Sequence, residues 1–419
     1  MSAVEHAPAP RRAQKNLLPP TERRALGPGG GAVADVLWRA WQKGAEDAMD
    51  RVYDGPFAHG FHSWPAGLHP SVARVVVEEL LPMVGDGVVA DPFVGGGTVA
   101  LAAAIAGRDV VGTDLNPLSR LVAAERCCAR TDDEAAAVLA IATAVCDRSK
   151  ERVRKKVAAR APVDRDTAAH FAPHTLMELA GLLAEIDAVE AAKAPPATRR
   201  TFAVCFSAIL TKASRRRGDT DQPDGDVAGK KNVGRFLPSE WWLAKVQELL
   251  TKQQAFSAHH HARGGTIPAC TFVTDDAFAL PRHLPKQGAA LIVTSPPYGG
   301  TYDYTDHHRD RLAFLGLDGT ALTRGELFAR RRPSRREFDT HTARLLEVLR
   351  ASLAPRGLAT LVVGDALFDG TLVDAARHIE ERATAADLRA VAVCSAPRPD
   401  YVGQGRETRL EHLVVLGAR

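Results

Sequence analysis

A short turn, Ser295-Pro296-Pro297-Tyr298, combines hydrogen-bond acceptors with an aromatic ring. It follows the apolar run 289–293, which predicts a buried parallel strand. Because proline has a fixed φ and no N–H, the turn cannot pair into a sheet and its carbonyl groups stay free as acceptors. Taken alone, it also fits a simple strand-terminating turn. At the carboxyl edge of a sheet, where open α/β folds hold ligands, it predicts a site for a planar group with an exocyclic amine.

A glycine-rich loop lies earlier in the chain, at residues 91–98 (Asp-Pro-Phe-Val-Gly-Gly-Gly-Thr). It follows a strand pattern at 87–90, opens a helix predicted for 99–106, and precedes a second strand pattern that ends in Asp114. Glycines let the backbone pass close to a cofactor, and the acid suits a pair of ribose hydroxyls. This pattern alone leaves an NAD-dependent enzyme open. Asp91 disfavours it, because a carboxylate before the loop would repel a pyrophosphate.

Two further segments extend the pattern. The run 270–281 begins as a strand and reaches Asp275 and Asp276, either of which could accept a hydrogen bond from the adenine amine of a cofactor. His69 precedes Pro70 at the start of a helix predicted directly before the glycine-loop strand. It could touch the cofactor there, and it is equally well explained as a helix-entry residue.

In order and spacing, these motifs resemble those of S-adenosylmethionine-dependent DNA amino-methyltransferases, which methylate cytosine N4 or adenine N6. The resemblance covers residues 60–129 and 266–419. It implies a class I methyltransferase fold, an α/β fold with a Rossmann-like, mostly parallel sheet and helices on both faces, and S-adenosylmethionine as the cofactor. Asp276 matches the family position for the adenine contact best. The implied catalytic residues are Ser295, Pro296, Pro297 and Tyr298, and the implied cofactor contacts are His69, Asp91, Phe93, Gly95, Gly97, Thr98, Asp114, Asn116 and Asp276.

The resemblance also implies a mechanism. Hydrogen bonds from the amine to Ser295 and to the Pro296 carbonyl would free the nitrogen lone pair for an in-line displacement at the sulfonium. Tyr298 would stack on a base flipped out of duplex DNA, and no metal is required. Serine before Pro-Pro is commoner among cytosine-N4 enzymes, whereas adenine enzymes usually carry aspartate. We therefore predict cytosine N4 as the target and keep adenine N6 as the alternative.

The composition agrees with a soluble enzyme. The chain has 419 residues, of which 45% are hydrophobic and 25% charged, enough for one large or two ordinary domains. Its formal net charge is only +4, so the molecule as a whole does not indicate a polyanion partner. Six cysteines without Cys-x-x-Cys spacing predict neither a zinc site nor a disulfide framework. With no signal peptide and no membrane-length apolar stretch, these features predict a cytoplasmic location.

Composition and periodicity divide the chain into four parts. Residues 1–32, rich in Pro, Gly, Ala and Arg, predict a disordered tail. Residues 33–130 carry the cofactor loop and form the first part of the methyltransferase domain. Residues 131–265 show helical spacing and no strand signal, which predicts a helical insertion and a candidate target-recognition region. Residues 266–419 complete the sheet and carry the catalytic turn.

Arginine residues are concentrated in two clusters. Such clusters often only solvate a surface, but arginine also binds phosphate in a bidentate fashion. We therefore predict contacts that give affinity for the DNA backbone without sequence choice. DNA methylation is also compatible with a cognate restriction or defence partner. The predicted nucleic-acid contacts are Arg215, Arg216, Arg217, Arg330, Arg331, Arg332, Arg335 and Arg336.

Four alternative functions stay open. An RNA or tRNA base methyltransferase shares the Asp-Pro-Phe loop and the Pro-Pro-Tyr turn. A protein glutamine methyltransferase uses a similar turn, usually with asparagine where Ser295 stands. A non-catalytic module could bind cofactor or nucleic acid without turnover, although it would not need Asp91, Asp114 and Asp276 together. A dehydrogenase would leave the Pro-Pro-Tyr turn unexplained.

Overall fold

The computed structural model describes most of the chain, including both halves of the sheet. The described residues are 17–50, 55–65, 67–191, 195–216, 233–297, 304–325, 334–368, 371–399 and 408–419. Five residues singled out from the sequence lie outside them: Tyr298, Arg217, Arg330, Arg331 and Arg332.

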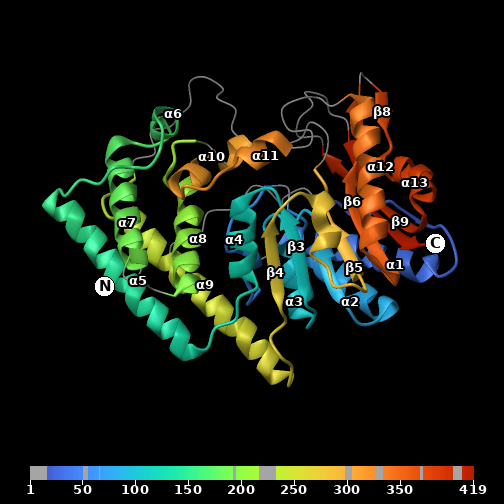
Figure 1. Cartoon of the computed structure of the whole chain (residues 1–419), viewed down its shortest axis with the longest axis horizontal. Helices are drawn as coiled ribbons and strands as arrows, with labels where there is room; N and C mark the ends of the chain where they lie inside the picture. Colours follow the sequence, from blue (N-terminus) through green and yellow to red (C-terminus); the bar gives the residue numbers. More distant parts are fainter. Residues whose placement is uncertain are drawn as a thin grey trace.

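The centre of the molecule is an eight-stranded sheet with the strand order β1-β9-β10-β6-β5-β2-β3-β4 (Figure 1). Neighbouring strands from β6 to β4 run parallel, whereas β10 is antiparallel to both β6 and β9. A small separate sheet pairs β7 (Ala366–Phe368) with β8 (Thr371–Val373). The strands of the main sheet are β1 (Glu22–Ala25), β2 (Val88–Asp91), β3 (Val110–Asp114), β4 (Cys270–Thr274), β5 (Ala289–Thr294), β6 (Leu353–Gly364), β9 (Leu388–Pro399) and β10 (Thr408–Ala418).

Helices cover both faces of the sheet and form two hydrophobic cores. Side chains alternate along the central strand β5, so Leu291 and Val293 join one core and Ile292 joins the other. The first core includes residues of α1 (Gly30–Asp50), α2 (Pro70–Val84) and α3 (Thr98–Ile105). The second includes residues of α12 (Arg335–Ser352) and α13 (Ala375–Ala383). This layering and strand order are those of a class I methyltransferase fold, so the predicted fold class is confirmed.

The described residues between β3 and β4 form helices joined by loops and contain no strand. It lies beside the β4 edge of the sheet, on the left in Figure 1. A capping box between Thr131 and Glu134 starts its first long helix. The helices from β3 to β4 are α4 (Pro117–Arg126), α5 (Asp132–Lys155), α6 (Arg165–Ala169), α7 (Pro173–Ala191), α8 (Pro196–Ala213) and α9 (Leu237–Ala262).

A buried polar cluster joins this insertion to the sheet domain. Glu125 of α4 is fully buried and accepts hydrogen bonds from Arg200 Nε at 2.7 Å and Thr201 Oγ1 at 2.9 Å. Gln253 of α9 donates to the same carboxylate at 2.9 Å. Removing one partner of a buried ion pair is costly because it strands the other charge. The cluster therefore fixes how the insertion sits against α4.

The structure corrects part of the predicted tail of residues 1–32, of which residues 1–16 lie outside the described residues. Residues 22–25 form β1, an edge strand that pairs antiparallel with β9, and α1 begins at Gly30. These residues bury little apolar surface, which is why the composition predicts disorder. Backbone pairing forms the strand instead, and Arg24 reinforces it through two hydrogen bonds to Glu380.

Several short elements carry no clear periodicity and are absent from the sequence-based prediction. They are η2 (Ala58–Gly60), η3 (Ala277–Arg282), α10 (Tyr304–Phe314), α11 (Thr320–Gly325), η4 (Thr384–Ala386) and the β7–β8 pair. Two of them, α10 and α11, lie beyond the carboxyl ends of the strands (Figure 1). They therefore border the edge where the sequence predicts the functional site.

Candidate functional site

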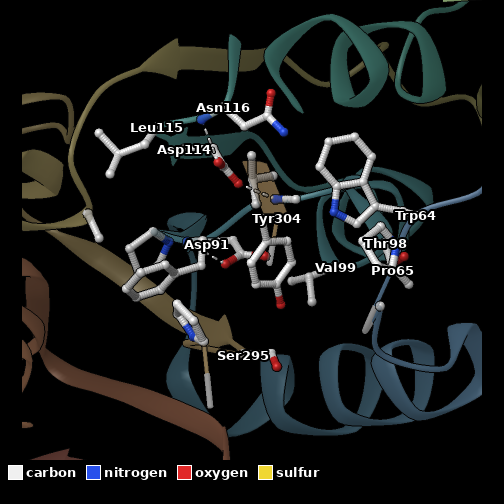
Figure 2. Close-up of a pocket in the computed structure, with 18 of the residues that line it drawn as sticks. Trp64, Pro65, Asp91, Thr98, Val99, Asp114, Leu115, Asn116, Ser295 and Tyr304 are labelled. Carbon is white, nitrogen blue, oxygen red and sulfur yellow. Dashed lines mark hydrogen bonds between the residues drawn. The ribbon is translucent and has the colours of Figure 1, made fainter. Parts of the chain in front are cut away.

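A pocket of about 1010 Å³, including its open mouth, lies at the carboxyl ends of β2, β3, β4 and β5. We call it the donor pocket. It brings together most of the residues that the sequence motifs predict, from three separate parts of the chain (Figure 2). The predicted residues that line it are Asp91, Phe93, Gly95, Thr98, Asp114, Asn116, Asp276, Ser295 and Pro297.

Two predicted cofactor residues are absent from this lining. His69 caps the N-terminus of α2, where its Nδ1 atom accepts the N–H of Ser71 at 3.2 Å. Burial lowers the pKa of His69 to about 4, which keeps the ring neutral and able to accept. Gly97 caps α3 with a φ of 78°. An added Cβ there would lie 2.9 Å from Ala123 Cα, so Gly97 lets α3 pack tightly against α4.

A pair of glycine substitutions tests this packing role. Gly107 also has a positive φ, of 80°, but has nothing within 4 Å of an added Cβ. Gly107→Ala should therefore lower the free energy of unfolding only by the cost of a left-handed backbone conformation, about 1–2 kcal/mol. Gly97→Ala should lower the free energy of unfolding by about 3 kcal/mol or more, because the new methyl group would also collide with the backbone of Ala123. Urea unfolding of both variants measures the difference, and equal losses would show that the contact with Ala123 is unimportant.

Asp91 joins the donor pocket to the catalytic turn. It is 4% exposed, and its Oδ1 atom accepts the N–H of Phe93 at 3.1 Å and the hydroxyl of Thr294 at 2.7 Å. Burial raises the pKa of Asp91 to about 7, although these hydrogen bonds act in the opposite direction. Thr294 is the residue before Ser295. The same carboxylate thus fixes the end of β2 against the end of β5.

Asp114 shapes the glycine loop as well as the pocket. Its Oδ2 atom accepts the N–H of Gly95 and its Oδ1 atom that of Asn116, both at 2.8 Å (Figure 2). Burial raises the pKa of Asp114, and the two N–H groups partly offset the effect. Each carboxylate oxygen can accept more than one hydrogen bond. Asp114 can therefore hold the loop and still accept from a ligand hydroxyl pair.

The two candidate acids after β4, Asp275 and Asp276, make different contacts. Asp276 lines the donor pocket and caps η3 by accepting the N–H of Phe278 at 2.9 Å. Asp275 instead contacts His283, with 2.8 Å between its Oδ2 atom and the ring Nε2 atom. Of the two acids, only Asp276 belongs to the pocket lining.

The aromatic side chains Trp64 and Tyr304 also line the pocket, and sequence reasoning missed Trp64 (Figure 2). Trp64 packs on the glycine loop so closely that an added Cβ on Gly95 would lie 2.9 Å from its Nε1 atom. Its ring also lies against His308 of α10, with the ring centroids 4.4 Å apart. The only sign of this role in the sequence is that Trp64 and Pro65 lie shortly before His69. No periodicity connects Trp64 to the glycine loop about thirty residues later.

Arg311 of α10 connects this aromatic wall to the insertion. It is 2% exposed, and its Nη2 atom donates to Ser63 Oγ at 2.9 Å and to Thr211 Oγ1 at 2.8 Å. Its Nη1 atom lies 3.4 Å from His308 Nδ1. Ser63 precedes Trp64, whereas Thr211 belongs to α8. One buried guanidinium thus contacts the pocket wall, the helix after the catalytic turn and the insertion.

A second, mainly apolar cavity of about 670 Å³ lies on the other side of the catalytic turn. Phe93 and Pro297 line both cavities, whereas Pro296 lines only the second. The second cavity extends between the sheet, α12 and α13. Its aromatic lining consists of Phe93, Phe278, Phe338 and His341.

The arginines predicted to bind nucleic acid differ in their surroundings. Arg216 forms an ion pair with Asp306 at 2.7 Å, which ties the end of α8 to the start of α10. Arg335 pairs with Asp339 at 2.9 Å within α12. Arg215 and Arg336 are exposed. The structure thus gives Arg216 and Arg335 partners inside the chain, and it leaves the side chains of Arg215 and Arg336 at the surface.

One group in the described residues has metal-ligand chemistry, although the sequence predicts no metal. It consists of Asp365, Asp374 and His412. His412 lies between Ser395 Oγ at 2.8 Å and Asp365 Oδ1 at 2.9 Å, so the buried ring already links three parts of the sheet domain. None of the described helices combines the length and apolarity needed to cross a lipid bilayer.

No protein-family model matches the chain, and no curated protein sequence matches it. Solved structures with a related arrangement include the rRNA methyltransferase aviRa from Streptomyces viridochromogenes, 14% identical, covering 85% of this chain and 88% of that one, with a TM-score of 0.34. TrmN from Thermus thermophilus is 12% identical and covers 96% of this chain and 82% of that one, with a TM-score of 0.33. Scores this low describe a general arrangement of helices and strands only.

Proposed function

We propose that this protein is an S-adenosylmethionine-dependent methyltransferase that modifies an exocyclic amine of a nucleic-acid base, with cytosine N4 of duplex DNA as the first candidate. The observation that carries the proposal is the Thr294–Asp91 hydrogen bond of 2.7 Å. It fixes a turn rich in hydrogen-bond acceptors directly beside a pocket with the chemistry of a nucleoside site. Enzymes with the class I methyltransferase fold use S-adenosylmethionine.

The donor pocket fits the different parts of this cofactor. The Asp91 carboxylate would bind its ammonium or sulfonium end. Asp114 would accept hydrogen bonds from the ribose hydroxyls, and Asp276 would accept one from the adenine amine. Trp64 presents an aromatic face near the glycine loop, where it can stabilise a neighbouring cation.

The catalytic turn supplies acceptors for the amine protons. The Ser295 hydroxyl makes no hydrogen bond to any other described residue, so it is free to accept one from the substrate. Accepting these protons localises the nitrogen lone pair and stabilises the positive charge that develops as the methyl group moves. Holding the two reactants in line supplies much of the remaining acceleration.

We assign the acceptor base to the second cavity. It borders the donor pocket at Phe93 and Pro297, and Pro296 lies in its wall. The base ring would lie in this cavity and its amine at the shared border with the donor pocket, near Ser295, because an in-line displacement leaves nothing between the amine and the methyl group. Apolar and aromatic walls suit a flat ring that has left a base stack.

The pH dependence of cofactor binding tests the role of Asp91. The cationic cofactor binds the carboxylate form, whereas burial holds the pKa of the free site at about 7. Below pH 7, Asp91 must lose its proton before the cofactor can bind. Each unit by which the pH is lowered should therefore weaken the affinity for S-adenosylmethionine about tenfold, whereas above pH 8 the affinity should be constant. Calorimetry between pH 5.5 and 8.5 measures this slope. Asp91→Asn should bind weakly with no such slope, and a flat wild-type profile would contradict the assignment.

An RNA base is the second candidate substrate. The Asp-Pro-Phe loop and the Pro-Pro turn are compatible with it. Labelled S-adenosylmethionine, offered with unmethylated duplex DNA, total RNA or a protein extract, separates the candidates. We expect label in DNA, and none with Asp91→Asn. Label in RNA alone would establish the second candidate, whereas label in protein alone would contradict both. Bound cofactor without any transfer would indicate a non-catalytic module.

A further inference from the structure

The donor pocket is acidic, although its proposed ligand also carries one anionic group. The carboxylates of Asp91, Asp114 and Asp276 line it, and its described lining residues include no lysine, arginine or histidine. The ammonium, sulfonium, ribose hydroxyls and adenine amine of S-adenosylmethionine all suit carboxylates. Its α-carboxylate does not, because like charges repel. This group therefore needs a part of the pocket that offers N–H or O–H donors.

A buried arginine lies directly behind one end of the pocket, at the glycine loop. Arg126, the last residue of α4, is 3% exposed, and its Nη2 atom donates to the His62 carbonyl at 2.7 Å. Its Nη1 atom would lie 3.0 Å from a Cβ atom added to Gly96, which lines the pocket. The absence of a side chain at Gly96 thus lets the guanidinium approach the loop closely from behind.

Arg126 also determines how one hydroxyl of the pocket can bond. Its Nη1 atom donates to Thr98 Oγ1 at 3.5 Å, so the Thr98 oxygen acts as an acceptor on that side. A hydroxyl has one O–H donor besides its acceptor sites. Thr98 lines the pocket, and no described residue accepts its O–H. This hydroxyl can therefore donate to a ligand.

A second donor lies at the same end of the pocket. Gly96 lies between Trp64 and Arg126, since its added Cβ would be 2.9 Å from Trp64 Cβ and 3.0 Å from Arg126 Nη1. The Nε1–H group of Trp64 can only donate, and no described residue accepts it. In Figure 2, Trp64 and Thr98 are on the right of the pocket, whereas Asp114 is on the left. The two donors thus lie apart from this acid.

We infer that Arg126 makes the glycine-loop end of the donor pocket the site for the α-carboxylate of the methyl donor. Arg126 is a positioning residue, because it leaves the Thr98 O–H available to the ligand. Its charge also lies behind the loop, where water and salt screen it little. The inference rests on the proposed function, because it takes the ligand to be S-adenosylmethionine. The pocket should therefore select methyl donors that carry this carboxylate.

Decarboxylated S-adenosylmethionine is the probe, because it keeps the sulfonium, amine, ribose and adenine and lacks only the carboxylate. Calorimetry at pH 7.5 measures the Kd of both ligands for each variant. The wild type should bind S-adenosylmethionine about tenfold more tightly than the probe. Arg126→Met should bind S-adenosylmethionine about tenfold more weakly, whereas its affinity for the probe should fall by no more than about twofold.

Arg130→Met is the matched control. Arg130 is 6% exposed, and it donates to Gln253 Oε1 and Thr201 Oγ1 of the insertion, each at 2.8 Å. Both substitutions remove a buried guanidinium, so thermal unfolding should show a loss of stability in each. Only Arg126→Met should change the ratio of the two Kd values. Arg126→Lys keeps the charge and should recover part of this ratio.

Equal weakening of both ligands by Arg126→Met would overturn the inference, because a purely structural role does not distinguish the ligands. If Arg126→Met does not fold, Thr98→Val replaces it, since this change removes the hydroxyl and keeps the shape of the side chain. Thr98→Val should weaken S-adenosylmethionine more than the probe. An unchanged ratio in that variant would also overturn the inference.

The measurement separates this inference from the proposed function, because binding is measured without any nucleic acid. A protein that prefers the carboxylated ligand but transfers no methyl group to a base would refute the proposed activity and leave the inference standing. If bases are methylated while Arg126→Met keeps the wild-type ratio, only the inference fails. If the wild type binds neither ligand, both fail.

Discussion

Replacing Ser295 with alanine should lower the rate of methyl transfer by about 10²–10³-fold, the usual cost of losing one preorganised hydrogen-bonding group. The Ser295 hydroxyl lines the donor pocket and makes no hydrogen bond to any other described residue. Its removal should therefore cost no stability, and the affinity for S-adenosylmethionine should stay within about twofold. The lost interaction is one that forms with the amine of the acceptor base.

Single-turnover rates with saturating cofactor measure this effect, and urea unfolding provides the stability control. Ser295→Thr keeps a hydroxyl at the same position and should recover part of the rate. A Ser295→Ala variant with the wild-type rate would exclude the hydroxyl from the chemistry. A variant that loses cofactor affinity instead would indicate that Ser295 belongs to the donor side.

The second large effect is expected at Arg311. Arg311→Met should lower the free energy of unfolding by about 3–5 kcal/mol, because a buried cation that bridges three segments leaves its polar partners unsatisfied. The affinity for S-adenosylmethionine should also fall about tenfold, since Ser63 and His308 position Trp64 beside the glycine loop. Urea unfolding and calorimetry measure the two effects separately.

Arg309→Met is the matched control for this variant. Arg309 lies on the same helix, but its side chain is 42% exposed and forms an ion pair with Asp306. Its loss should cost about 0.5 kcal/mol or less. If Arg311→Met does not fold, Thr211→Val removes a single hydrogen bond of the guanidinium and should show smaller changes in the same direction. Equal behaviour of Arg309→Met and Arg311→Met would contradict the positioning role.

Strong local patterns explain why the sheet could be predicted from the sequence. The apolar run at 289–293 becomes β5, buried along its whole length, and the strand pattern before the glycine loop becomes β2. The order of the motifs along the chain brings their acids to one edge, since parallel strands end at the same side of a sheet. Asp91, Asp114 and Asp276 accordingly line one pocket.

Residues positioned by contacts distant in sequence could not be predicted in this way. Trp64 reaches the pocket through His308 and the glycine loop, which no periodicity connects to it. Nothing in the sequence decides between cofactor contact and helix capping for His69; that choice depends on where α2 begins. Arg216 belongs to a basic run in the sequence, yet its partner Asp306 lies ninety residues away. The edge strand β1 forms through backbone pairing that its composition does not indicate.

The most direct test of the central claim is the chemical identity of the product. Duplex DNA incubated with the protein and S-adenosylmethionine is digested to nucleosides and analysed by mass spectrometry, with Ser295→Ala as the control. We expect N4-methylcytosine that depends on Ser295, and N6-methyladenine would change only the target base. Methylation at a ring carbon or ring nitrogen, or no methylated base in DNA or RNA, would contradict transfer to an exocyclic amine.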